Sequence, residues 1–206
     1  MGFGVVAAIL YWTIDVDAVH ATAARLPAGV AFALLVVLPL LGVPASMLHV
    51  AAGIRFGAAL GYGLVVLSIA LQLVASYTIV RLWRKRFERS RWLMRLRQRI
   101  PAGAHASVCA FTVLLPGAPF AAVNYSLPLL GVPLRTLLLC ALPLHALRAT
   151  VTVALGDQSG HLTAMRLGAL LAYALLILGV CAWMFRRLQS QFAGPQPAAD
   201  GRKQSA

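Results

Sequence analysis

Acidic side chains are scarce in this chain, which limits the classes of protein to which it can belong. Asp and Glu account for five of the 206 residues, against 18 Lys and Arg, and 61% of the residues are hydrophobic. A soluble domain carries about 25% charged residues, whereas this chain carries 11%. Apolar runs of about twenty residues, enough to cross a ~30 Å hydrocarbon layer, recur along the sequence. We therefore expect an integral membrane protein.

The chain also lacks the patterns of a metal site, a disulfide framework or a common hydrolase. Cys109, Cys140 and Cys181 have neither metal-ligand nor redox spacing, so we expect small buried hydrophobes, with no disulfide, metal or cofactor. No HExxH pair, GxSxG elbow or Lys-and-Arg phosphatase signature occurs, so we do not expect an enzyme. No Lys or Arg precedes Arg25, so a cleaved signal peptide is not expected.

Half of the basic residues gather in one short stretch. Nine of the eighteen lie between Arg81 and Arg99, with apolar segments on both sides. This pattern is typical of a cytoplasmic loop, and each basic residue near an anionic surface contributes about 1 kcal/mol to its binding. We expect membrane lipids with anionic headgroups as partners. Nucleic acid is not expected, because no reader motif accompanies the charge.

Apolar runs organise the rest of the chain, and prolines break two of them near the middle. Such a run is either a kinked span or a re-entrant hairpin. An arm of about 12 residues reaches only ~18 Å, so it can enter the bilayer and return. The runs are 30–52, 56–80, 108–132, 134–155 and 167–185, and the first and third contain the breaks, at Gly42-Val43-Pro44 and Pro116-Gly117-Ala118-Pro119.

The positions of the basic residues favour hairpins over kinked spans. If 108–132 enters and returns, five later basic residues share the cytoplasmic side with the basic loop, as the positive-inside rule prefers. The same choice for 30–52 gives a hairpin from the opposite face, and hence two inverted units as in some transporters. An ordinary bundle of kinked helices remains the alternative. The five residues are Arg135, Arg186, Arg187, Arg202 and Lys203.

The expected fold is therefore an all-α integral membrane protein. It is an inverted-repeat bundle with two proline-broken re-entrant helical hairpins and about three to four transmembrane helices. We expect a bacterial inner (plasma) membrane location, with the basic loop and the C-terminus cytoplasmic. The divisions are 1–28 (short N-terminal helix and outer loop), 29–83 (first hairpin plus transmembrane helix), 84–106 (basic loop), 107–157 (second hairpin plus transmembrane helix), 158–188 (last transmembrane helix) and 189–206 (disordered tail).

Motifs in both halves point to one family. The first half holds Gly42-Val43-Pro44, the AAG-x-x-FG element at 51–57 and Tyr77-Thr78-Ile79-Val80-Arg81. The second half holds P-x-x-PF-x-x-x-NY at 116–125, followed by Gly131-Val132. Together, over about residues 30–157, they resemble the DedA family, whose VTT domain also occurs in SNARE-associated Golgi proteins.

The resemblance implies the inverted hairpin architecture and a role in lipid translocation that supports envelope homeostasis. Its members resemble scramblases or carriers of phospholipid or polyprenyl phosphate. The chain departs from the family at Val113, where many relatives carry an arginine three positions before the hairpin proline. It also has no Asp or Glu between residues 30 and 80, so carboxylate-based proton coupling has no carrier in that half.

Ionisable groups at membrane depth are costly, which makes four residues candidates for a substrate-binding site: His49, Arg55, His145 and Arg148. His145 and Arg148 are three apart and share a helix face, and arginine binds phosphate through a bidentate fork. The alternatives are that Arg55 reaches the outer headgroups, that Arg148 pairs with Asp157 or the interface, and that His145 hydrogen-bonds a carbonyl in the bundle.

Residues at the broken second run complete the candidate site: Pro116, Pro119, Phe120, Asn124 and Tyr125, with Arg81 at the cytoplasmic end of the first span. An amide such as that of Asn124 can partner both carbonyl and amide groups of unwound backbone. The leading function is lipid translocation. The alternatives are a non-transporting adaptor or assembly factor and an ion- or proton-coupled solute transporter, and a homo-oligomer is possible.

Overall fold

The computed structural model describes residues 26–83, 86, 91–98, 100, 102–115 and 118–159, with isolated residues between 168 and 186. All secondary structure in this part of the chain is helical, which confirms the all-α prediction. The elements are α3 (Ala28–Leu40), α4 (Ala45–Leu82), α6 (Arg91–Gln98), the 3-10 helix η1 (Ala102–Ala104), α7 (His105–Leu114), α8 (Phe120–Leu129), α9 (Leu134–Thr136), the π-helix η2 (Leu137–Ala141) and α10 (Leu142–Gln158).

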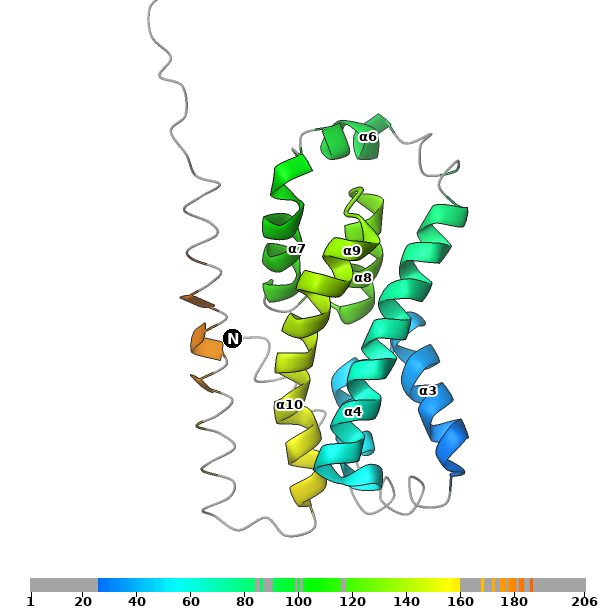
Figure 1. Ribbon diagram of the computed structural model, residues 1–206, viewed down its shortest axis with the longest axis vertical. Coiled ribbons are helices and arrows are strands. Elements are labelled where there is room, and N and C mark those ends of the chain that lie inside the picture. Colours follow the sequence, from blue (N-terminus) through cyan, green and yellow to red (C-terminus); the bar gives the residue numbers. More distant parts are fainter. Residues whose placement is uncertain are drawn as a thin grey trace, which may run out of the picture.

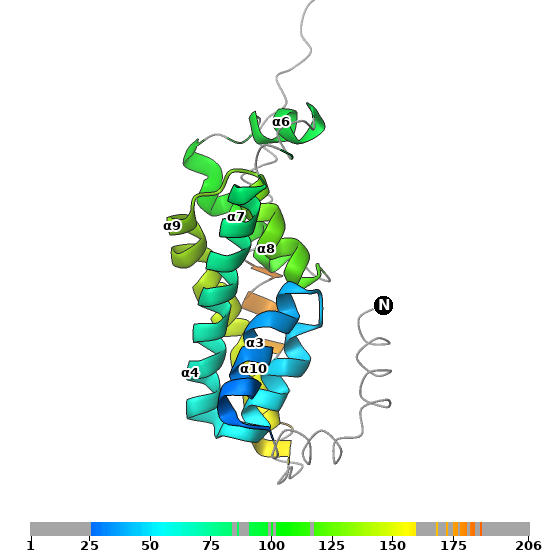
Figure 2. The ribbon, with the colours of Figure 1, turned by 90° about the vertical axis from the view of Figure 1, so that its right-hand side faces the viewer.

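Two helices are long and apolar enough to cross a bilayer. They are α4, with 38 residues, and the continuous helical stretch Leu134–Gln158, with 25 residues, formed by α9, η2 and α10. They run side by side along the molecule in both views (Figures 1 and 2). Residues 1–25 of the expected N-terminal segment 1–28 lie outside the described residues, as do the tail 189–206 and most of the expected span 167–185.

The first half of the described chain folds as two short helical arms followed by a long one. Helix α3 ends in a turn where Gly42 has φ 99°, and α4 then begins after Pro44. At Gly57, with φ 74° and ψ 176°, the backbone leaves the helix, so α4 consists of a short arm (45–56) and a long arm (58–82). Figure 1 shows α3 and the short arm beside the lower half of the long arm. We call 28–82 the first unit.

In the second half of the described chain, two short helices also precede a long one. Helix α7 and helix α8 form the two short arms, and a turn in which Gly131 has φ 87° leads into the long stretch Leu134–Gln158. Both views show α7 and α8 beside the upper half of the long helices (Figures 1 and 2). We call 105–158 the second unit.

Prolines mark where these helices begin. Pro27, Pro44, Pro119 and Pro133 stand immediately before α3, α4, α8 and α9. A proline has no backbone N–H to leave unpaired, and its ring holds φ near the helical value, so it suits a helix start. The predicted break at Gly42-Val43-Pro44 is confirmed, whereas Pro39 and Pro128 lie inside α3 and α8.

The two units pack so closely at Gly53 and Gly156 that neither position has room for a Cβ atom. A Cβ atom on Gly53 of the short arm would collide with the carbonyl oxygen of Val153 in α10, and one on Gly156 would collide with that of Val50. Helices without a hydrophobic drive between them, as in lipid, associate through such small residues. This crossing holds the first unit's short arm against the second unit's long helix.

Candidate functional site

Four buried polar side chains lie among the helices of the two units. His49 and His145 are 6% and 5% exposed, and Gln72 and Asn124 are fully buried. Each has at least one polar atom with no hydrogen-bond partner among the described residues: Nε2 of both histidines, Oε1 of Gln72, and both amide atoms of Asn124. We call these four residues the polar centre. Buried polar atoms in native proteins are rarely left unpaired.

His145 has neighbours in its own unit and one, His49, in the first unit. Its imidazole meets the ring of Phe120 edge-on, with centroids 4.7 Å apart and planes at 62°. Phe120 is the first residue of α8, and Asn124 lies one turn farther along that helix. His49 of the short arm and Arg148 of α10 both lie close enough to His145 to interact with it electrostatically.

Two backbone carbonyl oxygens of α3 accept hydrogen bonds from side chains of α4 and α8. The amide Nε2 of Gln72 donates to the carbonyl oxygen of Leu35 at 2.8 Å, and the hydroxyl of Tyr125 donates to that of Leu40 at 3.3 Å. Leu35 and Leu40 are about 7.5 Å apart along the helix axis. The long arm of α4 and helix α8 thus both hold the end of α3 next to the polar centre.

Arg148 carries the positive charge nearest to this centre. Its guanidinium donates to the carbonyl oxygen of Val113 at 2.9 Å, near the C-terminal end of α7 and just before the proline turn. The structure shows other partners for the two residues of the expected Arg148–Asp157 pair: Arg148 bonds Val113, and the Asp157 carboxylate accepts from the backbone N–H of Ala58 at 3.0 Å. Asp157 is the only acidic side chain among the described residues.

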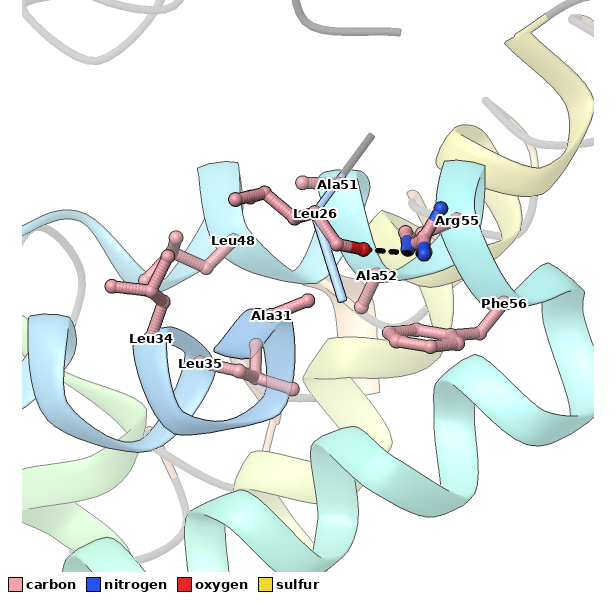
Figure 3. A pocket seen from close by; sticks show the side chains of 9 residues that line it. All are labelled: Leu26, Ala31, Leu34, Leu35, Leu48, Ala51, Ala52, Arg55 and Phe56. Carbon is pink, nitrogen blue, oxygen red and sulfur yellow. Dashed lines mark hydrogen bonds between the residues drawn. The ribbon is translucent and has the colours of Figure 1, made fainter. Parts of the chain in front are cut away.

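Arg55 lies apart from the polar centre. It donates to the carbonyl oxygen of Leu26 and stands 5.8 Å from the centroid of the Phe56 ring. It lines a cavity of about 80 Å³ between α3 and the short arm of α4, whose other lining residues are apolar (Figure 3). These lining residues are Leu26, Ala31, Leu34, Leu35, Leu48, Ala51, Ala52 and Phe56.

The remaining predicted residues take different positions. Arg81 is exposed in the last turn of α4, far along the long arm from Gly57. Pro119 directly precedes α8 and exposes its ring. Pro116 lies outside the described residues. Of the predicted set, the structure therefore brings His145 together with Phe120, His49 and Arg148, and Asn124 and Tyr125 follow Phe120 on α8.

Sequence reasoning missed the polar face of the long arm. Ser68, Gln72 and Ser76 recur every four residues and are all fully buried, so they form one stripe along α4. The hydroxyls of Ser68 and Ser76 donate to carbonyl oxygens three residues earlier, at 2.8 and 3.1 Å. A four-residue spacing of polar residues within an apolar run was the signal that identifies this stripe.

Two cysteines that are distant in the sequence meet in the structure. Cys109 of α7 and Cys140 of η2 have free thiols within hydrogen-bond reach of each other. The Cys140 thiol also donates to the carbonyl oxygen of Ala106 at 3.5 Å. The described residues hold no group of three His, Cys, Asp or Glu that could bind a metal ion. Cys181 lies outside the described residues.

Comparisons with known proteins find no counterpart. No family model matches the chain, and neither a curated protein nor a solved structure is significantly similar to it. The site must therefore be interpreted from its own chemistry.

Proposed function

We propose that this protein translocates lipids, as a scramblase or flippase-like carrier of the DedA type for phospholipid or polyprenyl phosphate. In this proposal the hairpins 28–56 and 105–129 enter a bacterial inner membrane from opposite faces, and the basic loop is cytoplasmic. The headgroup passes between the two units while the acyl chains stay in the bilayer, an arrangement known for transporters with inverted repeats and broken helices.

One observation carries the proposal: Arg148 brings a guanidinium to the carbonyl of Val113, between α10 and a hairpin arm. His145 lies one turn away on the same helix. The only acidic side chain among the described residues, Asp157, is nine positions farther along, about 13.5 Å by helical rise. A cationic site without a carboxylate suits a phosphate-bearing headgroup, for which arginine has the matching fork of donors.

The resemblance to the DedA family supports the same site. Many relatives carry an arginine at the position of Val113. In this chain the guanidinium of Arg148, on a neighbouring helix, donates to the backbone carbonyl of Val113. Arg148 would therefore supply the positive charge that the arginine supplies in those relatives. Two positions thirty-five residues apart in sequence would then fulfil one role.

Proteoliposomes containing the full chain test the proposal. A fluorescent phospholipid and a polyprenyl phosphate are each followed from one leaflet to the other. Arg148→Gln removes the charge but keeps an N–H donor for the Val113 carbonyl, whereas Arg148→Lys keeps the charge. We expect lipid to move at least about tenfold more slowly in Arg148→Gln than in the wild type, since a hydrogen bond to a charged group contributes roughly 1.5–3 kcal/mol. The rate should fall less in Arg148→Lys.

Arg135→Gln is the matched control, because Arg135 is an exposed arginine in α9 of the same long helical stretch. It removes one positive charge elsewhere and should leave the rate unchanged. If neither lipid moves although the protein is folded and abundant, the chain is a non-transporting adaptor. If Arg148→Gln moves lipid as fast as wild type, the cationic site is wrong.

A further inference from the structure

The cavity in the first unit combines an apolar lining with a positive charge. It has a volume of about 80 Å³ and lies between α3 and the short arm of α4 (Figure 3). Among the described residues that line it, Arg55 alone is charged. Leu35 and Ala52 are buried at the cavity, whereas Leu48 and Ala51 are half-buried, so one side remains accessible. An apolar cavity excludes water and favours an apolar occupant.

Two contacts hold the guanidinium of Arg55 at the edge of this cavity. It donates to the carbonyl oxygen of Leu26, and its Cζ atom lies 5.8 Å from the centroid of the Phe56 ring. Leu26 and Phe56 both line the cavity themselves. Arg55 is only half-buried, so an anionic ligand can reach the charge while its apolar part enters the cavity.

The position of Arg55 along α4 places the charge near one membrane surface. Arg55 stands two residues before Gly57, and Gly57 lies 24 residues before Arg81, about 36 Å along the long arm. The hydrocarbon layer is ~30 Å thick. When the basic loop that begins at Arg81 is cytoplasmic, Arg55 therefore lies at the headgroups of the outer leaflet. Leu48 is about 10.5 Å farther along the short arm, toward the hairpin turn inside the bilayer.

We propose that the first hairpin binds an anionic phospholipid of the outer leaflet, with its phosphate on Arg55 and the start of one acyl chain in the cavity. The volume suits about three groups of ~30 Å³, the size of a water molecule or a methylene. The rest of the chain stays in the bilayer. This inference rests on the membrane placement proposed above, but it does not require that the protein moves lipid.

The charge, and not the chain, gives this site its selectivity. Lipid tails are as apolar as the cavity lining, so an acyl chain gains little by leaving the bilayer for the cavity. A phosphate gains charge-assisted hydrogen bonds from the guanidinium. A zwitterionic headgroup carries its own cation, which competes for the same phosphate. A water-soluble phosphate lacks the chain that positions it.

Three ligands test the site with the full-length protein in a neutral detergent. They are phosphatidylglycerol and phosphatidylcholine with the same acyl chains, and glycerol 3-phosphate. The rise of the unfolding midpoint with ligand concentration gives each affinity. We expect phosphatidylglycerol to bind about tenfold more tightly than phosphatidylcholine, and glycerol 3-phosphate to give no rise at the same concentration. Equal affinities for the two lipids overturn the inference, and so does an equal rise with glycerol 3-phosphate.

Arginine variants locate the charge that the lipid uses. Arg55→Gln should weaken the binding of phosphatidylglycerol about tenfold and leave that of phosphatidylcholine unchanged, whereas Arg55→Lys should keep most of the preference. Arg135→Gln is the matched control, because Arg135 is an exposed arginine of α9 outside the cavity lining. It should bind like the wild type. A wild-type preference in Arg55→Gln contradicts the assignment.

A cavity-filling variant tests the place of the chain. Ala31 of α3 lines the cavity and is half-buried, so Ala31→Leu fills part of it and should weaken the binding of phosphatidylglycerol. Ala33→Leu on the same helix is the control, because Ala33 is exposed and outside the lining. Each variant is compared with its own lipid-free midpoint, so a change in stability does not imitate lost binding. Wild-type affinity in Ala31→Leu overturns the site.

The detergent measurement also separates this site from the translocation function. If no lipid moves in proteoliposomes but Arg55→Gln and Ala31→Leu both weaken the binding of phosphatidylglycerol, the lipid site stands and the translocation function fails. If lipid moves but the wild type binds both phospholipids equally, the translocation function stands and the lipid site fails.

Discussion

The two units reach similar shapes by different local means. In the first unit a single residue, Gly57, divides one continuous helical sequence into a short and a long arm. In the second unit a full turn that ends at Pro133 separates α8 from the long stretch, and that stretch contains the π-helix η2. Both bends use a glycine at positive φ, Gly57 or Gly131, but only the second adds a turn that ends at a proline.

The units also differ in how they satisfy their own helix ends. The first unit has no acidic side chain, and the helix that restarts after Gly57 receives its cap from Asp157 of the second unit. In both units the helices that begin after prolines have no side-chain cap. The first unit therefore depends on the second for a stabilising contact at its sharpest bend.

Gly53→Ala should have the largest effect, because it places a methyl group against the carbonyl of Val153 at the crossing of the units. The short arm and α10 must separate, which should lower the free energy of unfolding by about 3 kcal/mol or more. The unfolding midpoint in detergent measures the loss. Gly63→Ala in the same helix is the control, because a methyl there meets no atom within 4 Å; an equal loss in both variants would contradict the crossing.

Gly57→Ala tests whether the first unit's bend needs glycine. A residue with a Cβ at φ 74° and ψ 176° is strained by about 1–3 kcal/mol, so the free energy of unfolding should fall by that amount. Thermal unfolding measures it, with Gly29→Ala as a control at a position open to the addition of a methyl group. A wild-type midpoint for Gly57→Ala would mean that α4 runs through without the bend.

Asp157 variants measure the dependence of the first unit on the second. Asp157→Ala removes the acceptor for the Ala58 N–H and should cost about 1 kcal/mol, as for other lost helix caps. Asp157→Asn keeps an oxygen acceptor and should lose much less. Hydrogen exchange at the Ala58 amide should accelerate in Asp157→Ala; if Asp157→Asn is equally affected, the charge rather than the cap is responsible.

Tyr125→Phe should have the smallest effect. It removes one hydrogen bond from α8 to the end of α3, at 3.3 Å, and such a bond contributes about 0.5–1.5 kcal/mol. The half-buried ring stays in place. Tyr125→Leu also removes the ring and should be less stable than Tyr125→Phe in the same unfolding measurement. Equal stabilities for the two variants would show that the hydroxyl, and not the ring, joins the first unit to α8.

Some of the site was predictable because its residues are unusual in apolar segments. His49, His145 and Arg148 were predicted because they are ionisable. Phe120, Asn124 and Tyr125 were predicted from the resemblance to a family motif. Gln72 was not predicted because its amide is uncharged and the four-residue pattern that it forms with Ser68 and Ser76 lies within a long apolar run. Arg55 was predicted, but it faces Leu26 and an apolar cavity instead of the polar centre.

Composition and the apolar runs predict the helical class and two long apolar helices, and glycine and proline predict the break at 42–44. These features depend on composition and on proline and glycine, whose backbone restrictions act within a few residues. Only the tertiary structure decided which distant groups meet, as with Asp157 and Ala58, ninety-nine residues apart. Such contacts depend on how the helices pack at Gly53 and Gly156. The residues next to these glycines in the sequence do not determine that packing.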